Sequence, residues 1–508
     1  MLPKMRSIVL DKRVFGARNS VLCMTTLLTG GASIADAQVS DTTKKVEPVA
    51  TITIDPAVTH GVWEGWGTSL AWWANVFGAR DDIADLFFTT RDVVIDGVTL
   101  PALGMNIARY NAGACSWNEI DGKKMVVSKH IPPHRQMEGF WLDGKNADPN
   151  SASWNWSVDA KQRDMLLKAR KRGANRFELF SNSPMWWMCS NLNPSGANNG
   201  AHDNLAPEHY GSFATYLATI ARRAKDKWGL TFTTVEPFNE PISTWWSADS
   251  RQEGCHFSHQ AQAAVLKELR SAMDKQGLKK MTIAASDENA YDQSLSTWNS
   301  FDAATKKIVG QINVHGYQET GGRRDLVYEA AKRDGKPLWN TEYGENDTSG
   351  LKMAHCINLD FRYLRQTAWS YWQPLDGSNW GLFDSDLPKG IIGKVNPKYY
   401  VLAQYSRHIR PEMTILESSD ANNVVAYSAK QKKLVIVTLN QGAARRWKYD
   451  LSRFNIGKRK VVSRITEPKA TARYQLREGL RVEKHRFEVD LPADSIQTFE
   501  FSEVTIKD

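Results

Sequence analysis

Between residues 62 and 395, short apolar and β-branched runs alternate with longer amphipathic stretches. The short runs end at polar or aromatic residues, which is typical of β-strands. The longer stretches repeat apolar residues every three or four positions, which predicts helices. One such face contains Val265, Leu266, Leu269 and Met273, and another Phe213, Tyr216, Leu217 and Ile220. Eight strands are expected, at residues 63–67, 104–110, 176–182, 233–240, 281–287, 311–317, 337–342 and 368–373.

Eight strands alternating with helices predict an α/β fold, a (β/α)8 TIM barrel over residues 61–398. Farther on, the chain changes to short runs separated by turn residues. These runs predict an attached C-terminal antiparallel β-sandwich over residues 399–508. Its strands are expected at 423–428, 433–439, 486–491 and 496–501, and the second of them is almost continuously apolar. An N-terminal strand at 49–60 is expected to join the sandwich, because the two termini would then lie together.

The first residues have the pattern of an export signal. A basic stretch precedes an apolar run at residues 21–28, and Ala35-Asp36-Ala37 gives the small-x-small pattern of a cleavage site. We expect a signal peptide at residues 1–37, a linker at 38–48, and a secreted or periplasmic protein. No run approaches the ~20 apolar residues of a membrane helix, so no membrane partner is expected.

Net charge and cysteine content narrow the possible partners and cofactors. The formal charge is +9, but lysine and arginine are scattered along the chain, which argues against a nucleic-acid groove. Four of the five cysteines follow residue 37, and an even number in an exported protein permits disulfides. Cys189 and Cys255 are the best pair, because they follow neighbouring barrel strands; the alternative is four buried free thiols, which include Cys115 and Cys356. No metal-ligand cluster stands out, so neither a metal nor another cofactor is expected.

Polar and aromatic residues recur where the predicted barrel strands end, and barrel active sites lie at those ends. They are Arg109, Asn182, Asn239, Glu240, Asp287, His315, Tyr317, Glu342 and Trp372. Two strand-end carboxylates, Glu240 and Glu342, suit acid/base and nucleophile chemistry on a glycosidic bond; the alternative is two surface glutamates. Asn239 can reach a sugar 2-hydroxyl, while Arg109 and Tyr317 can keep Glu342 ionised.

His315 has two open interpretations. It lies two residues before Tyr317, so both side chains lie on the same strand face and His315 becomes a candidate site residue. The alternative is a buried packing histidine. The 19 tryptophans are equally ambiguous, because an indole ring can stack on a sugar or fill a core.

Five stretches of the chain resemble glycoside hydrolase family 30, and within it the endo-β-1,6-galactanases. They are WEGWGTSLAWWA at 63–74, NSPMWWM at 182–188, PFNEP at 237–241, HGY at 315–317 and WNTEYG at 339–344. The resemblance covers roughly residues 48–505. It implies a retaining mechanism with Glu240 as acid/base and Glu342 as nucleophile. It further implies Arg109, Asn239 and Tyr317 as their supports and Trp372 as a sugar platform.

The function expected from these observations is hydrolysis of β-1,6-galactan chains of arabinogalactan by a secreted, retaining endo-glycosidase that acts as a monomer. Alternatives are a β-1,6-glucanase, a xylanase or an exo-acting β-glycosidase on the same scaffold, and, in a different class, a non-catalytic carbohydrate-binding protein. The long segment 111–150 leaves endo and exo action open. The residues expected to bind substrate are Trp66, Trp72, Asn182, Trp186, Trp245, Asp287, Trp372 and Trp380.

Overall fold

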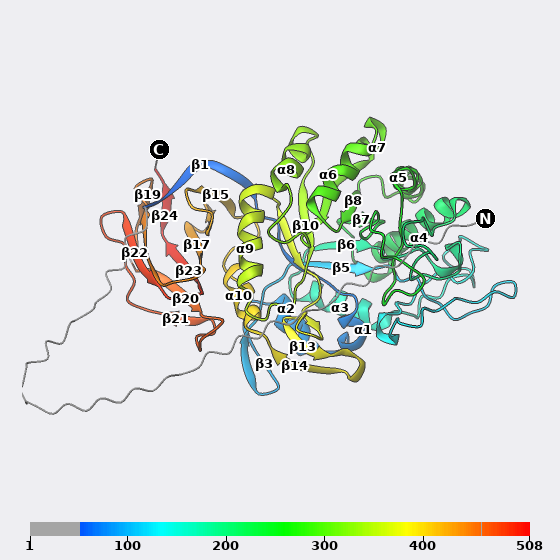
Figure 1. Ribbon diagram of the computed structural model, residues 1–508, viewed down its shortest axis with the longest axis horizontal. Coiled ribbons are helices and arrows are strands. Elements are labelled where there is room, and N and C mark those ends of the chain that lie inside the picture. Colours follow the sequence, from blue (N-terminus) through cyan, green and yellow to red (C-terminus); the bar gives the residue numbers. More distant parts are fainter. Residues whose placement is uncertain (1–50, 459, 508) are drawn as a thin grey trace, which may run out of the picture. The chain divides into compact units, whose positions relative to one another are not determined.

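The computed structural model describes residues 51–458 and 460–507. The expected signal peptide and linker lie outside these residues. Within them, eight parallel strands form a closed barrel in the order β10-β11-β2-β5-β6-β7-β8-β9, which confirms the predicted TIM barrel (Figure 1). The barrel strands are β2 (Gly65–Ser69), β5 (Ile107–Asn111), β6 (Arg176–Phe180), β7 (Thr234–Glu236), β8 (Thr282–Glu288), β9 (Val309–His315), β10 (Leu338–Tyr343) and β11 (Ala368–Tyr371).

Helices follow each barrel strand and cover the outside of the barrel. The helices are α1 (Trp73–Phe77), α2 (Asp81–Phe88), α3 (Ala160–Lys171), α4 (Tyr210–Arg223), α5 (His259–Lys275), α6 (Tyr291–Ser300), α7 (Ala303–Ile308), α8 (Arg324–Arg333), α9 (Leu351–Leu359) and α10 (Pro397–Ser406). Both amphipathic faces noted in the sequence are buried, in α4 and α5. The helix after the eighth strand, α10, crosses the boundary expected at 398/399. In the described residues, no helix combines the length and apolar character that a bilayer span requires.

Three short structures extend the loops of the barrel. A hairpin of β3 (Asp92–Ile95) and β4 (Val98–Pro101) follows α2. A three-stranded sheet follows β11 and consists of β12 (Leu375–Asp376), β13 (Phe383–Asp386) and β14 (Ile391–Val395). The long β5–α3 connection contains mostly loop structure.

The C-terminal strands form the predicted β domain around a second apolar core. Nine strands are hydrogen-bonded in the order β21-β20-β23-β17-β16-β15-β1-β18-β22, and β19 pairs with β24. The N-terminal strand β1 pairs antiparallel with β15 and parallel with β18. The strands are β1 (Ile52–Val62), β15 (Thr414–Ser418), β16 (Asn423–Ser428), β17 (Lys433–Asn440), β18 (Arg445–Asp450), β19 (Phe454–Ile456), β20 (Val462–Thr466), β21 (Gln475–Arg477), β22 (Arg486–Leu491), β23 (Ser495–Ser502) and β24 (Val504–Ile506).

Strand β17 lies between two apolar cores, and this position explains its almost continuous apolar sequence. Leu434 and Ile436 belong to the core of the β domain, whereas Val435 and Val437 belong to the core that contains the barrel helices. Successive side chains of a strand point to opposite faces, so a strand buried on both sides must be apolar at every position. Strands β17 and β23 contact α9 and α10, respectively (Figure 1). The β domain is therefore packed directly against the barrel.

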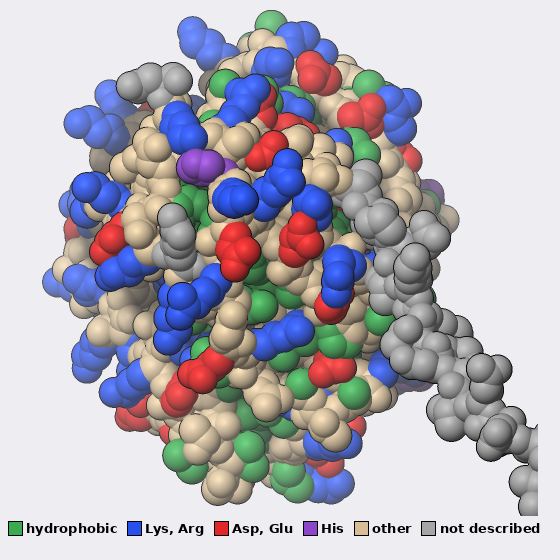
Figure 2. All heavy atoms as spheres, turned by 90° about the vertical axis from the view of Figure 1, so that its left-hand side faces the viewer, with side chains coloured by type: hydrophobic (Ala, Val, Ile, Leu, Met, Phe, Trp, Pro, Cys, Tyr) green, Lys and Arg blue, Asp and Glu red, His purple; other side chains and the backbone are tan. Residues whose placement is uncertain are grey.

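Charged side chains on the β domain are mixed in sign. Figure 2 faces the end of the molecule that carries this domain, and Lys and Arg alternate there with Asp and Glu. Arg446 pairs with Asp490 at 2.8 Å and Lys448 with Glu488 at 2.9 Å, across β18 and β22. Exposed pairs of this kind contribute about 0–1 kcal/mol each to stability, so they chiefly balance local charge.

The predicted Cys189–Cys255 disulfide is wrong, because all four cysteines of the described residues are free and buried. Three of these thiols follow barrel strands, and each has its own hydrogen-bond acceptor. Cys255 donates to the His256 carbonyl at 3.4 Å, Cys189 to the Met185 carbonyl at 3.7 Å, and Cys115 to Glu253 Oε1 at 3.3 Å. Burial raises the pKa of Cys189 to about 12, which disfavours the reactive thiolate.

Candidate active site

A cleft with a volume of about 1180 Å³ lies over the carboxyl ends of the barrel strands. Asn239 and Glu240 reach it after β7, Tyr317 after β9, Glu342 from β10 and Trp372 after β11. The connections after the strands thus bring residues more than a hundred positions apart into one site. This is the end of the barrel at which TIM-barrel enzymes carry their catalytic groups.

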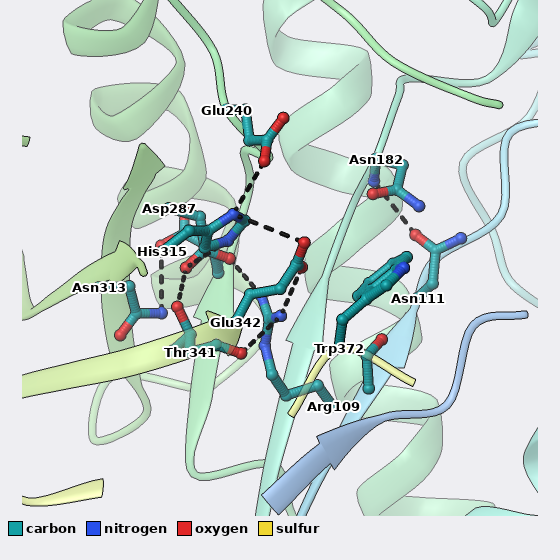
Figure 3. Close-up of polar contacts among 12 residues, drawn as sticks. Arg109, Asn111, Asn182, Glu240, Asp287, Asn313, His315, Thr341, Glu342 and Trp372 are labelled. Carbon is teal, nitrogen blue, oxygen red and sulfur yellow. Dashed lines mark hydrogen bonds and ion pairs between the residues drawn. The ribbon is translucent and has the colours of Figure 1, made fainter. Parts of the chain in front are cut away.

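The two predicted carboxylates face each other across this site. One side-chain atom from each of Glu240, His315 and Glu342 lies within 4.8 Å of the other two (Figure 3). Glu240 has a left-handed backbone with φ of 50°, which a non-glycine residue rarely adopts. Hydrogen bonds hold this conformation: the Glu240 N–H donates to the Asp287 carbonyl at 2.8 Å, and Trp246 Nε1 donates to the Glu240 carbonyl at 2.9 Å.

His315 lies between the two glutamates and is fully buried. Its Nδ1 is 3.2 Å from Glu240 Oε1 and 3.7 Å from Glu342 Oε1, and its Nε2 is 3.5 Å from Asp287 Oδ1 (Figure 3). Burial opposes protonation, but Glu342 and Asp287 raise the pKa of His315 to about 10. The histidine is therefore an imidazolium at neutral pH and belongs to the site rather than to the packing of the core.

Arg109 connects the base of the site to Glu342. Its Nη1 donates to Glu342 Oε2 at 3.2 Å and to the Thr341 carbonyl at 3.0 Å. Its Nε donates to Glu178 Oε1 at 2.8 Å, and its Nη2 donates to Asp287. Burial opposes the charge of Arg109, but the surrounding carboxylates raise its pKa above the ordinary value. A permanent cation thus lies beneath the nucleophile candidate.

Two buried carboxyl groups beneath the site, Asp287 and Glu236, have pKa values shifted in opposite directions. Burial works against ionisation of Asp287, but Arg109 and His315 lower its pKa below the ordinary value. Burial, together with Asp287 and Glu178, raises the pKa of Glu236 well above its ordinary value. These shifts favour the ionised form of Asp287 and the neutral form of Glu236. Asp287 does not line the cleft, so its predicted contact with substrate is wrong; it positions Arg109 and His315 instead.

Tyr317 and Asn289 complete the hydrogen bonds of the two glutamates. The Tyr317 hydroxyl donates to Glu342 Oε1 at 2.7 Å. Asn289 Nδ2 donates to Glu240 Oε1 at 2.8 Å. Burial raises the pKa of Glu342, and His315 and Arg109 limit the rise. Asn289 was missed in the sequence, although it directly follows β8 and strand-end position could have identified it.

The two strand-end asparagines differ in exposure to the cleft. Asn239 lines it, and its Oδ1 has no hydrogen-bond partner among the described residues. It is placed to meet a ligand hydroxyl next to Glu240. Asn182 is buried outside the lining, and its backbone N–H donates to Asn111 Oδ1 at 3.1 Å (Figure 3). Its side-chain amide has no hydrogen-bond partner among the described residues, and its contact with substrate stays a prediction.

The predicted aromatic platforms divide into two groups. Trp72, Trp245, Trp372 and Trp380 line the cleft. Trp72 packs edge-on against Trp372, with ring centroids 5.1 Å apart, and both are largely buried. Trp245 and Trp380 expose 48% and 37% of their surface, so their rings remain available to a ligand.

Trp66 and Trp186 do not line the cleft, and their prediction as sugar platforms is wrong. Trp66 is buried among Trp63, Phe361 and other aromatic residues, and its Nε1 donates to the Ile409 carbonyl at 2.8 Å. Trp186 is fully buried and donates to Ser116 Oγ at 2.7 Å. Each indole N–H thus has an internal partner, as expected of a tryptophan that fills a core.

Comparisons with known proteins identify the family of this chain. The model of O-Glycosyl hydrolase family 30 matches residues 49–315. The chain is 49% identical over 460 residues to an endo-beta-1,6-galactanase of Hypocrea rufa, covering 90% of this chain and 95% of that protein. It is 24% identical to an exo-beta-1,6-galactobiohydrolase of Bifidobacterium longum subsp. longum, covering 80% of this chain and 35% of that protein. Among solved structures, a family 30 subfamily 8 xylanase from Clostridium acetobutylicum superposes with a TM-score of 0.65 at 21% identity, covering 89% of this chain and 99% of that one.

Proposed function

Because the chain belongs to glycoside hydrolase family 30 and is an O-glycoside hydrolase, we propose that it cleaves β-1,6-galactan internally with retention of anomeric configuration. The observation that carries the mechanism is that one carboxylate oxygen of Glu240 lies within 4.8 Å of a carboxylate oxygen of Glu342. Retaining enzymes hold their two carboxyl groups about 5–5.5 Å apart, whereas inverting enzymes hold them about 6.5–9.5 Å apart to admit water. The galactan assignment draws on the 49% identical relative from Hypocrea rufa.

In the first step of the proposed mechanism, Glu342 attacks the anomeric carbon and Glu240 donates its proton to the departing glycosidic oxygen. Arg109 and Tyr317 donate to different oxygens of Glu342 and so favour its ionised form. In the second step, Glu240 takes a proton from water, the water oxygen attacks the anomeric carbon, and the ester bond to Glu342 breaks.

His315 can interact with either glutamate as the negative charge moves from Glu342 to Glu240. Before the first step, the imidazolium Nδ1 faces the Glu342 carboxylate at 3.7 Å and already lies 3.2 Å from Glu240 Oε1. Once Glu342 is esterified, it loses its charge, and the same Nδ1 can pair with the newly formed Glu240 carboxylate at 3.2 Å. The imidazolium therefore stabilises whichever glutamate is ionised, and it does so without releasing its own proton.

Internal cleavage is supported by the residues that line the cleft. Partly exposed Trp245 and Trp380 offer stacking surfaces in addition to those at the catalytic centre. Export remains part of the proposal on the strength of the signal pattern in residues 1–37. Arabinogalactan is the polysaccharide in which β-1,6-galactan side chains would be met, and the chain is proposed to act on it as a monomer.

Product analysis tests the proposal directly. Purified enzyme is incubated with β-1,6-galactan, de-arabinosylated arabinogalactan, β-1,6-glucan and β-xylan, and proton NMR records the first anomer released. We expect short galacto-oligosaccharides in the β configuration. An initial α-anomer would disprove retention, galactose alone from the first minute would disprove internal cleavage, and faster release from another glycan would disprove the galactan assignment.

A further inference from the structure

Building on the proposed function, we infer that two exposed tryptophans of the cleft bind opposite halves of the polysaccharide. The part of the chain that leaves first, on the reducing-end side of the scissile bond, lies over Trp245. The part that becomes bonded to the enzyme, on the non-reducing side, lies over Trp380. Each tryptophan is thus assigned to one side of the scissile bond.

Trp245 lies near the proposed acid, Glu240, and is connected to it through Trp246. Its neighbour Trp246 donates Nε1 to the Glu240 carbonyl at 2.9 Å, and the two indole rings are 6.0 Å apart. Trp245 and Trp246 both line the cleft together with Asn289, which holds the Glu240 carboxylate. A sugar stacked on Trp245 would therefore lie beside the proton donor.

Hydrogen bonds hold the loop that carries Trp245. The Trp245 carbonyl accepts from the Ser247 N–H at 2.8 Å and from Ser250 Oγ at 2.9 Å. The Ser250 carbonyl in turn accepts from Ser128 Oγ of the long β5–α3 connection at 2.7 Å. A platform held in this way loses little conformational entropy when a sugar stacks on it.

Trp380 lies near the proposed nucleophile, Glu342, and is connected to it through Tyr317. Its ring centroid is 6.2 Å from that of Tyr317, which donates to Glu342. A Cβ atom added to Gly344 would lie only 3.0 Å from the Trp380 ring, so the indole packs against the backbone two residues beyond Glu342. The Trp380 carbonyl accepts from the Tyr371 hydroxyl at 2.5 Å and from Lys398 Nζ at 3.1 Å, which anchors the residue.

The double-displacement mechanism indicates which half of the substrate each tryptophan contacts. In double displacement, the nucleophile bonds to the anomeric carbon of the sugar that stays, while the acid protonates the oxygen of the sugar that leaves. Sugars near Glu342 are therefore on the retained side, and sugars near Glu240 are on the leaving side. The two exposed indoles stand next to different glutamates, so they serve different halves of the substrate.

The test compares Trp245→Ala and Trp380→Ala on two substrates. One is a β-1,6-galacto-oligosaccharide, and the other a 4-nitrophenyl β-1,6-galactobioside, whose leaving group contains no sugar. Loss of one stacking contact is expected to lower kcat/KM about tenfold where that contact is used. Trp245→Ala should lower kcat/KM for the oligosaccharide only and leave the aryl glycoside within about twofold of wild type. Trp380→Ala should lower both. Trp117→Ala, at a residue 59% exposed and outside the cleft lining, is the matched control.

A second readout separates binding direction from a general loss of activity. With an oligosaccharide labelled at its reducing end, Trp245→Ala should move the preferred cleavage site toward the reducing end, and Trp380→Ala should move it the opposite way. Equal losses on both substrates, or shifts in the reverse directions, would overturn the inference. If wild-type enzyme prefers another β-glycan, the galactan assignment fails, and the direction is measured with that glycan and its aryl glycoside instead.

Discussion

Tyr317→Phe tests how the site keeps the proposed nucleophile ionised. The substitution removes the only hydroxyl that donates to Glu342 Oε1 among the described residues, at 2.7 Å, and leaves the Arg109 contact with Oε2 in place. A hydrogen bond to a charged group contributes about 1.5–3 kcal/mol. One pKa unit corresponds to about 1.4 kcal/mol, so the pKa of Glu342 should rise by about 1–2 units in the variant.

The sign of the activity change follows from the form of Glu342 that reacts. Only the carboxylate attacks, so a higher pKa moves the acidic limb of the kcat/KM profile to higher pH. The assay is a pH–rate profile on an aryl β-1,6-galactobioside, for which protonation of the leaving group matters least. Tyr343→Phe is the matched control, because Tyr343 is adjacent to Glu342 but its hydroxyl contacts Cys356 Sγ at 3.7 Å. An acidic limb at the wild-type pH in Tyr317→Phe would refute the reasoning.

Four further outcomes are expected. Glu342→Gln should lose more than about 99% of activity while circular dichroism stays that of wild type, because an amide is a poor nucleophile; substantial residual turnover would identify another nucleophile. Glu240→Ala should lose far more activity on galactan than on aryl glycosides, and azide should restore turnover as a β-glycosyl azide; equal losses without rescue would point to a different acid. Since the pKa of His315 is raised to about 10, its stabilisation of the fold is complete below the unfolded pKa near 6.5 and is lost as pH rises toward 10; its NMR signal should not titrate between about pH 5 and 8. Thiol titration of the chain after residue 37 should find none reactive when native and four after denaturation without reductant, since all four are buried and free; fewer than four would indicate a disulfide.

Much of the fold could be predicted because strand and helix periodicities are local properties of the sequence. All eight barrel strands overlap their expected positions, but several boundaries differ. The strand expected at 233–240 ends at Glu236, because the chain must turn before Glu240 adopts its left-handed backbone. The strand expected at 104–110 begins at Ile107, after Gly104 with φ of 64°. Such turns depend on contacts with other segments, which periodicity does not report.

The sequence alone identified the pair Glu240 and Glu342, because both stand at strand ends and the carboxyl ends of all parallel barrel strands meet on one face. It could not decide which tryptophans face the cleft, since an indole ring serves equally as core or platform until its neighbours are known. Nor could it show that His315 lies between the two glutamates, or that Asp287 positions Arg109 and His315. Distances between residues far apart in the chain, together with the burial that sets their pKa values, exist only once the barrel has closed.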